Sequence, residues 1–420
     1  MTAPLETYPK AHPFQSGAFR ILWCSSLASA AAQLMERVAT GWLALETGGG
    51  ALGVGIVFAA RSLPSLVLGL AAGSLADRSD RRRILRAVAA AGAILTTALG
   101  LLVGTGQITL WQVAAIAFLS GCIQVSDQPS RQALIYDSVG RDQVPSAIAL
   151  NAVASRLFGA VGAFAGGLLI PAFGVANCYF AVAASYLVSL VVISAMPNIQ
   201  STRPKASRSS FSEVAAGGVT LIGRLPAVRT LVISAIACEI FGFSFQTVVP
   251  SLARDVFAAG PEGLGILSAA SSIGATVAVL ILTGLPARLP REPMLTGVYA
   301  LYGVAIVALA LAPDLTLAAA AILVVGGCAS AFDALQQTMI QLAVPEDQRG
   351  RAVGIWVFSL GSAPIGHLET GAVATGFGAP VALLINGSLV ALGALALWIG
   401  SPEFRPGHRK ATAPTVGNEP

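Results

Sequence analysis

Ionisable side chains stand alone within long apolar stretches of this sequence, where a charge is costly and therefore indicates function. Four of them are acids that form two pairs with nearly the same separation, Glu36 with Glu239 and Asp127 with Asp333. Acids repeated in this way could bind a cation, or could load and release protons, at a shared site. Structural ion pairs between helices are the alternative. The other ionisable candidates within apolar stretches are Arg37, Arg61, Arg131, Arg156, His367 and Glu369.

Two of the acids are favoured for coupling or substrate binding. Glu36 is the first candidate, and Asp127 is the second, although Asp127 could instead form a gate with Arg131. We expect Arg131 and Arg156 to lie nearer one end of their spans, where they could serve as anchors. His367 is of a type that titrates near neutral pH, but a lone histidine beside a helix end is more often a polar packing contact.

The composition excludes a water-soluble fold. Charged residues are 11% and hydrophobic residues 55% of the 420 residues, whereas a soluble domain has roughly 25% charged residues. A soluble enzyme and a nucleic-acid binder are therefore excluded. The five cysteines are isolated and no ATP-binding G-x-x-x-x-G-K-[S/T] pattern is present, so we expect no metal, cofactor or ATP-driven step.

Segments of about 20 mostly apolar residues are long enough to span a membrane. Polar turns separate twelve of them, which predicts an all-α membrane protein in the lipid bilayer. The predicted spans are 18–46, 51–75, 84–104, 108–137, 145–170, 176–196, 229–256, 262–285, 294–312, 315–343, 351–374 and 379–400.

Basic residues indicate the orientation of these spans. Five arginines follow the second span, and further basic residues follow the fourth, sixth, eighth, tenth and twelfth. The alternate connections contain no Lys or Arg. The positive-inside rule then places both termini in the cytoplasm. The richness in alanine, glycine and arginine suggests the inner membrane of a bacterium with GC-rich coding.

A polar segment after the sixth span divides the chain into two similar halves. Residues 134–143 resemble residues 339–348, at an offset of 205. Parallel six-helix repeats with the substrate between them are one transporter architecture. The expected regions are a cytoplasmic tail (1–13), an N-terminal six-helix bundle (14–196), a cytoplasmic linker (197–228), a C-terminal six-helix bundle (229–400) and a second cytoplasmic tail (401–420).

A basic turn after the second span carries the strongest motif. Residues 73–85 read GSLADRSDRRRIL, which resembles the major facilitator superfamily signature G-x-L-A-D-R-x-G-R-R/K-x-x-L, with Asp80 in place of a glycine. The resemblance implies two pseudo-symmetric six-helix bundles. It also implies a conformational switch in which Asp77 pairs with Arg81 and faces the eleventh span. The alternative is that the arginines only set the orientation of the spans in the membrane. The implied cytoplasmic gate is Gly73, Asp77, Arg78, Arg81 and Arg82.

Further segments are similar to the branch of that superfamily that includes the bacterial enterobactin exporter. They include 19–23 (FRILW), 128–134 (QPSRQAL) and 345–351 (PEDQRGR), and the resemblance covers residues 14–400. It implies a monomeric secondary exporter that is often proton-coupled. In the fifth span, alanine replaces the proline that antiporter relatives carry. The glycines at 159, 162 and 166 share a helix face and predict close packing.

We therefore expect a secondary active transporter that exports a small amphipathic molecule, such as a drug, siderophore or metabolite, by alternating access with proton antiport. One alternative is an uptake carrier or facilitator of the same fold without proton coupling. A remote alternative is a membrane receptor or membrane enzyme, which would need a sizeable soluble domain or a clustered catalytic set.

Overall fold

The computed structural model describes residues 12–78, 80–197, 223, 225–286, 289–345 and 349–401, and every regular element in these ranges is a helix. The predicted linker lies largely outside them. The helices of the first half are α1 (Gly17–Ala44), α2 (Gly50–Arg78), α3 (Arg81–Gly104), α4 (Leu110–Gln124), α5 (Asp127–Ser138), α6 (Val144–Phe173) and α7 (Val175–Ser194).

The second half contains both long helices and short helical turns. Its elements are α9 (Pro226–Ala237), η4 (Cys238–Gly242), η5 (Phe243–Thr247), α10 (Val249–Ser251), η6 (Leu252–Val256), α11 (Gly260–Gly284), α12 (Arg291–Ala310), α13 (Leu315–Leu342), α14 (Arg349–Leu360), α15 (Ala363–Phe377) and α16 (Ala379–Gly400).

The helices of the described residues can be grouped into twelve candidate crossings. Ten stretches of the described chain are long and apolar enough to span a membrane. The first, Gly17–Leu66, contains α1 and the first 17 residues of α2, which a turn at Gly48 (φ 80°) separates. The short helices α14 and α15 share one further crossing. The predicted all-α membrane fold is confirmed, and the described helices can be grouped into the twelve predicted spans.

Three predicted spans are discontinuous helices. Span 108–137 breaks between α4 and α5, span 351–374 breaks between α14 and α15, and span 229–256 passes through π-helical and 3₁₀ turns. Each restarted helix has a proline within three residues of its start. Proline lacks the backbone N–H that a continuous helix needs, so it favours a break at this point. These residues are Pro129, Pro250 and Pro364.

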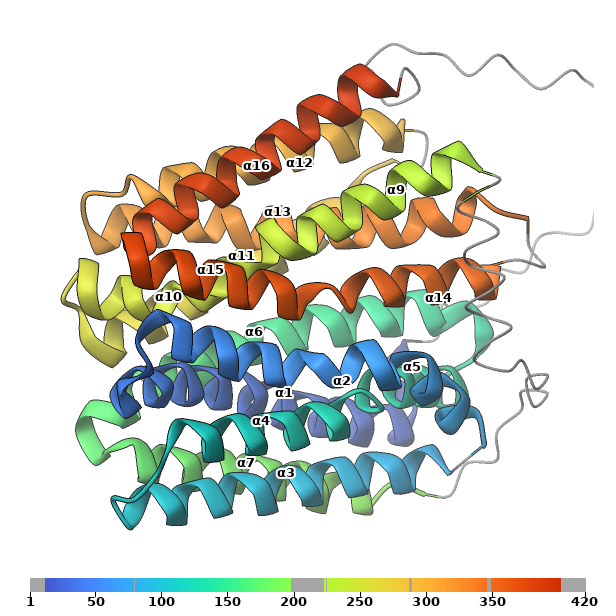
Figure 1. Cartoon of the computed structure of the whole chain (residues 1–420). Helices are drawn as coiled ribbons and strands as arrows, with labels where there is room; N and C mark the ends of the chain where they lie inside the picture. Colours follow the sequence, from blue (N-terminus) through green and yellow to red (C-terminus); the bar gives the residue numbers. More distant parts are fainter. Residues whose placement is uncertain are drawn as a thin grey trace, which may run out of the picture.

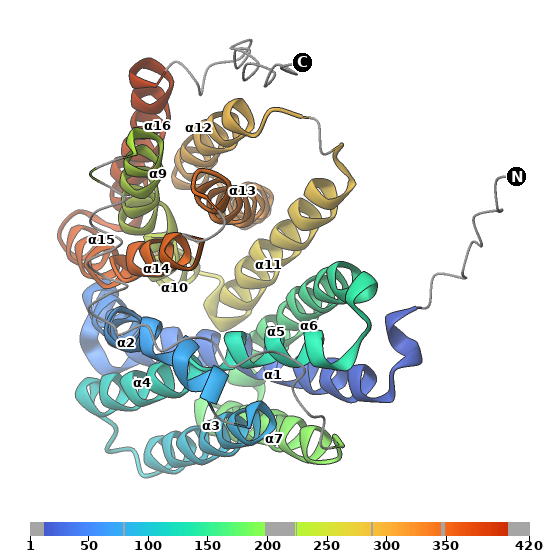
Figure 2. The ribbon, with the colours of Figure 1, turned by 90° about the vertical axis from the view of Figure 1, so that its right-hand side faces the viewer.

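The twelve crossings form two bundles side by side (Figures 1 and 2). Within the first bundle α1 packs against α6 and α7, and α3 packs against α7. In the second, α11 packs against α13, and α12 against α16. The bundles meet where α6 packs against α11 and α2 against α15. We call the end with η2 (Leu45–Gly49) and α10 the closed end, and the end where α1 begins and α16 ends the terminal end (Figure 1).

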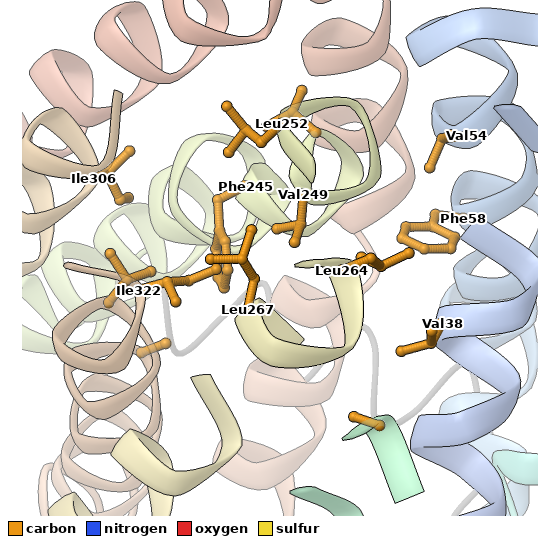
Figure 3. Close-up of a cluster of buried hydrophobic side chains, with 14 of the residues drawn as sticks. Val38, Val54, Phe58, Phe245, Val249, Leu252, Leu264, Leu267, Ile306 and Ile322 are labelled. Carbon is orange, nitrogen blue, oxygen red and sulfur yellow. The ribbon is translucent and has the colours of Figure 1, made fainter. Parts of the chain in front are cut away.

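Buried apolar side chains join the two halves towards the closed end. Val38 and Phe58 from the first half face Val249 and Leu264 from the second, and Ile322 lies deeper in the second half (Figure 3). All five are less than 9% exposed. This cluster packs the two halves against each other in the described state.

The predicted glycine packing in the fifth span is confirmed. A Cβ at Gly162 would collide with the backbone of Ala31 in α1, and one at Gly166 would lie 3.1 Å from Met35 Cγ. A Cβ at Gly159 would lie 2.7 Å from Leu34 Cδ2. The three glycines therefore allow α6 to approach α1 closely.

Candidate transport cavity between the two halves

A cavity of about 510 Å³ lies between the bundles and is lined by residues of α1, α2, α5, α6, η5, α10, α11 and α13. Both halves thus contribute to one wall. Serine, asparagine and glutamine side chains alternate there with apolar ones, which suits an amphipathic molecule. The charged residues of the wall are Arg37, Asp127, Arg131, Arg156 and Asp333.

Asp127 and Arg131 form one buried unit at the start of α5. Arg131 Nε lies 2.8 and 3.1 Å from the two carboxylate oxygens of Asp127. Its Nη1 donates to Ser26 Oγ at 3.0 Å and its Nη2 to Ser29 Oγ at 2.8 Å, both in α1. Because each charge is compensated and hydrogen bonded, this pair fastens the restarted half of the fourth span to α1.

Asp333 and Arg156 face the same cavity from opposite halves, on α13 and α6. Their charges attract each other, but among the described residues neither side chain has a hydrogen bond or an ion pair within 4.0 Å. An unpaired acid and an unpaired base in a cavity are groups that a charged ligand can bind.

Contacts between the halves seal the closed end. Arg37 Nη1 in α1 donates to Gln246 Oε1 in η5 at 2.5 Å. Arg254 Nη1 donates to the carbonyl oxygen of Leu45 at 3.3 Å. A Cβ at Gly41 would lie only 2.9 Å from the ring of Pro250.

The cavity extends from that seal towards the terminal end. Its wall includes Val38 and Pro250 near the closed end, and Ile135 and Ile148 within four residues of the terminal-end limits of α5 and α6. In the described state the cavity is therefore sealed at the closed end and extends, with its charged side chains, towards the terminal end.

Glu36 lies on α1 in the first half and does not line the cavity. Its side chain is 3% exposed, and its Oε1 lies 2.7 Å from Arg61 Nη1 in α2. Tyr186 of α7 donates to Glu36 Oε2 at 2.8 Å, and Gln124 of α4 donates to the Tyr186 hydroxyl at 3.3 Å. Glu36 and Arg61 thus join four helices of one bundle, and neither is among the lining residues.

Glu239 is not among the lining residues either, and its surroundings differ from those of Glu36. It sits in the π-helical turn η4, is 8% exposed, and has no hydrogen bond or ion pair to any residue that the structure describes. It interacts electrostatically with Asp333. The structure therefore brings two of the four predicted acids, Asp127 and Asp333, to the cavity, whereas Glu36 and Glu239 do not line it.

The two secondary candidates on α15 have local partners. His367 Nδ1 lies 2.8 Å from Thr247 Oγ1, and its ring packs edge-on against Phe58 at 5.8 Å between centroids. Glu369 Oε2 accepts hydrogen bonds from Thr370 and from Asn386 Nδ2, at 3.0 and 3.2 Å. His367 thus makes packing contacts between the halves. No group of three His, Cys, Asp or Glu in the described ranges could hold a metal ion.

The basic turn is described in part. Gly73, Asp77 and Arg78 are helical, but their side chains lie outside the described part of the structure. Arg81 forms an ion pair of 2.5 Å with Asp137 of α5, and Arg82 donates to the carbonyl oxygen of Met196. α14 packs against α2, as the superfamily resemblance implies.

Asp80 occupies the position of the glycine in the superfamily signature. It is the N-cap of α3, with extended backbone, and its carboxylate accepts a hydrogen bond from the backbone N–H of Arg82 at 3.0 Å. An aspartate suits this position because it satisfies an unpaired N–H of the first helical turn.

Sequence reasoning missed the residues that complete these clusters. Gln246, Tyr186, Ser26 and Ser29 bind the candidate charges. Polar but neutral residues are common in membrane spans, so their types gave no signal. Arg156 lies in the half of α6 that is nearer the terminal end, as expected, 12 residues from the start of the helix, and its side chain lines the cavity.

The comparisons with known proteins agree with this architecture. The family model described as transmembrane secretion effector, within the major facilitator superfamily, matches residues 9–411. The multidrug efflux pump Tap of Mycolicibacterium fortuitum is 26% identical over 91% of this chain and 96% of its own. The enterobactin exporter EntS of Shigella boydii is 28% identical over 60% of this chain and 62% of its own.

A solved structure supports the fold. A mutant of the nucleoside transporter NupG superposes with a TM-score of 0.75 at 16% identity, covering 91% of this chain and 99% of that one. This similarity concerns the fold alone. The matched family model covers nearly the whole chain, so the protein is a membrane transporter, not an enzyme, and belongs to the transmembrane secretion effector family of the major facilitator superfamily.

Proposed function

We propose that this protein exports a small amphipathic molecule, such as a drug, siderophore or metabolite, from the cytoplasm by alternating access, driven by inward movement of protons. The observation that carries the proposal is the cavity between the halves, where Asp333 and Arg156 lack partners among the described residues. Unpaired charges beside apolar side chains suit a molecule that has both a charged group and apolar surface. The drug and siderophore exporters among the relatives favour the same cargo.

The distribution of basic residues supports a cytoplasmic location for both termini, in the inner membrane of a bacterium. In that orientation the cavity of the described state faces the cytoplasm and the closed end faces outward. An exporter collects its cargo in this state. A carrier without proton coupling would have the same geometry, and its transport would not depend on a pH gradient.

The mechanism is a rocking of one bundle against the other. Opening the closed end requires the separation of Arg37 from Gln246 and of Arg254 from Leu45, which are contacts between halves. The ion pairs of Glu36 with Arg61 and of Asp127 with Arg131 lie within one half and move with it. Rigid bundles around a central site are the usual arrangement for alternating access.

The test is transport by the purified protein in proteoliposomes with an imposed pH gradient. Ethidium, a permanently cationic apolar dye, serves as the first probe, followed by neutral and anionic amphipathic compounds. We expect at least one probe to accumulate against its gradient only when protons move the opposite way. Accumulation that is indifferent to the pH gradient would favour the uncoupled carrier, and the absence of any transport would refute the proposal.

A further inference from the structure

Arg156 and Asp333 belong to opposite halves but lie in the same sector of the cavity wall. Their helices, α6 and α13, both pack against α11, which passes between them (Figure 2). Ser272 Oγ of α11 donates to the carbonyl oxygen of Arg156 at 2.7 Å. A Cβ at Gly326 of α13 would collide with the carbonyl oxygen of Ser271, the neighbouring residue of α11. α11 therefore forms the floor between a base on one side and an acid on the other.

The two charges also lie at a similar depth. Arg156 is 12 residues from the start of α6, Asp333 is nine residues from the end of α13, and both helix limits are at the terminal end. A helix rises about 1.5 Å per residue, which puts the two Cα atoms roughly 18 and 14 Å from that end. Because helices in contact have axes about 8–10 Å apart, the axes of α6 and α13 are at most about 20 Å apart. One small molecule beside α11 can therefore reach both side chains.

The wall around these charges has polar atoms without partners. Ser330 stands one turn before Asp333 on α13, and Asn151 lies between Arg156 and the terminal end on α6. Both line the cavity, and Ser330 Oγ and Asn151 Oδ1 are buried without a hydrogen-bond partner in the described part of the chain. Buried polar atoms are nearly always hydrogen bonded in proteins. A molecule with polar groups that binds here would supply a partner to each.

The other charged side chains of the wall already have partners. Asp127 and Arg131 form an ion pair, and Arg37 donates to a glutamine of the other half. Within the described residues, the cavity therefore offers a ligand one unpaired acid, Asp333, and one unpaired base, Arg156. A ligand with a single charge would compensate only one of them. A charge that is out of water and uncompensated is costly, so a ligand with both charges fits the cavity best.

The apolar part of the wall lies towards the closed end. Phe58, Val249 and Leu264 line the cavity there and belong to the cluster that joins the halves (Figure 3). Leu264 is four residues after the start of α11, and Ser272, which contacts Arg156, is eight residues further along. The wall thus changes from apolar to polar and charged over about two turns of this helix.

We propose that the cargo is an amphipathic zwitterion: its anionic group binds Arg156, its cationic group binds Asp333, and its apolar part lies towards the closed end. The guanidinium of Arg156 suits a carboxylate or a phosphate, either of which can accept two parallel N–H bonds. Because the two side chains come from opposite halves, the bound zwitterion joins the halves through both of its charges. The inference deepens the proposed function by naming the substrate class of the same cavity; it rests on transport through this cavity but not on proton coupling.

The first experiment compares four forms of one fluorescent probe, Nε-dansyl-lysine, which share the same apolar dansyl group. The free amino acid is a zwitterion, its α-methylamide a cation, its Nα-acetyl form an anion, and the molecule with both changes is neutral. Dansyl fluorescence measures their binding to the protein in lipid nanodiscs at slightly acidic pH, with empty nanodiscs as the background. We expect the zwitterion to bind about tenfold or more tightly than either singly charged form. A zwitterion that binds no more tightly than the cation or the anion would overturn the proposal.

The second experiment tests which residue binds which charge. In Arg156→Gln the zwitterion and the cation should bind equally, because the carboxylate of the probe has lost its partner. In Asp333→Asn the zwitterion and the anion should bind equally. Arg229→Gln and Glu262→Gln, which remove an exposed base of α9 and an exposed acid of α11, should keep the wild-type order of affinities. The wild-type order in both cavity variants, or an equal loss of affinity for all four probes, would contradict the assignment.

Failure of this inference is distinguishable from failure of the proposed function. If ethidium, which has only a positive charge, accumulates with the pH gradient but the wild type does not prefer the zwitterion, only the substrate class is wrong. If the wild type prefers the zwitterion but transports neither probe, export itself is wrong and the assignment of the two charged groups stands. The expected result is that both probes are transported, and that the zwitterion inhibits ethidium transport at about one tenth of the concentration that the cationic form requires.

Discussion

Arg37 on α1 and Gln246 on η5 are linked by a hydrogen bond of 2.5 Å between Nη1 and Oε1, which joins the first span to the seventh across the two halves. No carboxylate of the described residues pairs with Arg37. The hydrogen bond therefore joins a charged donor, the guanidinium, to a neutral acceptor, the amide oxygen of Gln246. A contact of this kind is strong enough to close one end and weak enough to open during a transport cycle.

Loss of this hydrogen bond should favour opening of the closed end. A hydrogen bond to a charged group contributes about 1.5–3 kcal/mol, so Gln246→Ala should shift the balance between states about tenfold or more towards the open form. The measurement is a distance distribution between spin labels at Gln107→Cys and Pro313→Cys in a chain without native cysteines. Gln246→Glu, which can form an ion pair with Arg37, should shift the distribution the other way; no change in either variant would disprove the role of this contact.

The close packing of α2 against α15 also holds the two halves together, and a larger side chain at this contact tests whether transport needs it. A Cβ at Gly55 would lie 2.5 Å from the carbonyl oxygen of His367, whereas a Cβ at Gly104 meets no atom within 4 Å. Gly55→Ala should therefore keep the halves apart at the closed end and reduce transport at least tenfold. Gly104→Ala is the matched control and should transport normally. Equal activity of the two variants would show that this approach is not needed for transport.

The Glu36–Arg61 pair should be important for stability. Removing one partner of a buried ion pair costs about 3–5 kcal/mol, because the other charge remains uncompensated. We expect Glu36→Gln and Arg61→Gln each to lower the thermal unfolding midpoint in detergent, and the double variant to lose much less than the sum. Strictly additive losses would indicate that the two side chains do not interact.

Even a conservative replacement of Arg131 should lower the stability of the protein. Its guanidinium binds Asp127 through Nε and two serines of α1 through Nη1 and Nη2, and a lysine ammonium cannot reproduce this planar arrangement. Arg131→Lys should therefore unfold at a lower temperature than wild type, and Arg131→Ala, which leaves Asp127 buried without a base, at a lower one still. Thermal unfolding of the three proteins side by side is the measurement, and an unchanged midpoint in Arg131→Lys would contradict the account.

The sequence predicted the fold well because membrane spans depend on local composition. Twenty apolar residues form a spanning helix wherever they occur, and the glycines at 159, 162 and 166 indicated a packed face without knowledge of the neighbour. The breaks in the fourth, seventh and eleventh spans were missed, because prolines are tolerated in membrane helices and their effect depends on tertiary contacts.

The candidate charges were also visible in the sequence, but their roles depend on partners distant in the chain. Glu36 and Glu239 look alike as isolated acids. They differ because Arg61 and Tyr186 come from other helices to one of them, and no comparable residue of the described chain reaches the other. Such long-range pairs follow from helix packing, which one sequence alone does not determine.

The central claim is that the cavity between the halves is the transport path and opens to one side at a time. Ser330 lines this cavity and Leu317 on the same helix is exposed on the outer surface of the bundle. Each is changed to cysteine in a chain without native cysteines, and a membrane-impermeant thiol reagent is applied from either side in oriented vesicles. We predict that the reagent modifies Ser330→Cys from the cytoplasmic side, that ethidium slows this reaction at least tenfold, and that Leu317→Cys is unaffected by the dye. Modification of Ser330→Cys equally fast from both sides, or without any protection by a transported probe, would contradict the account.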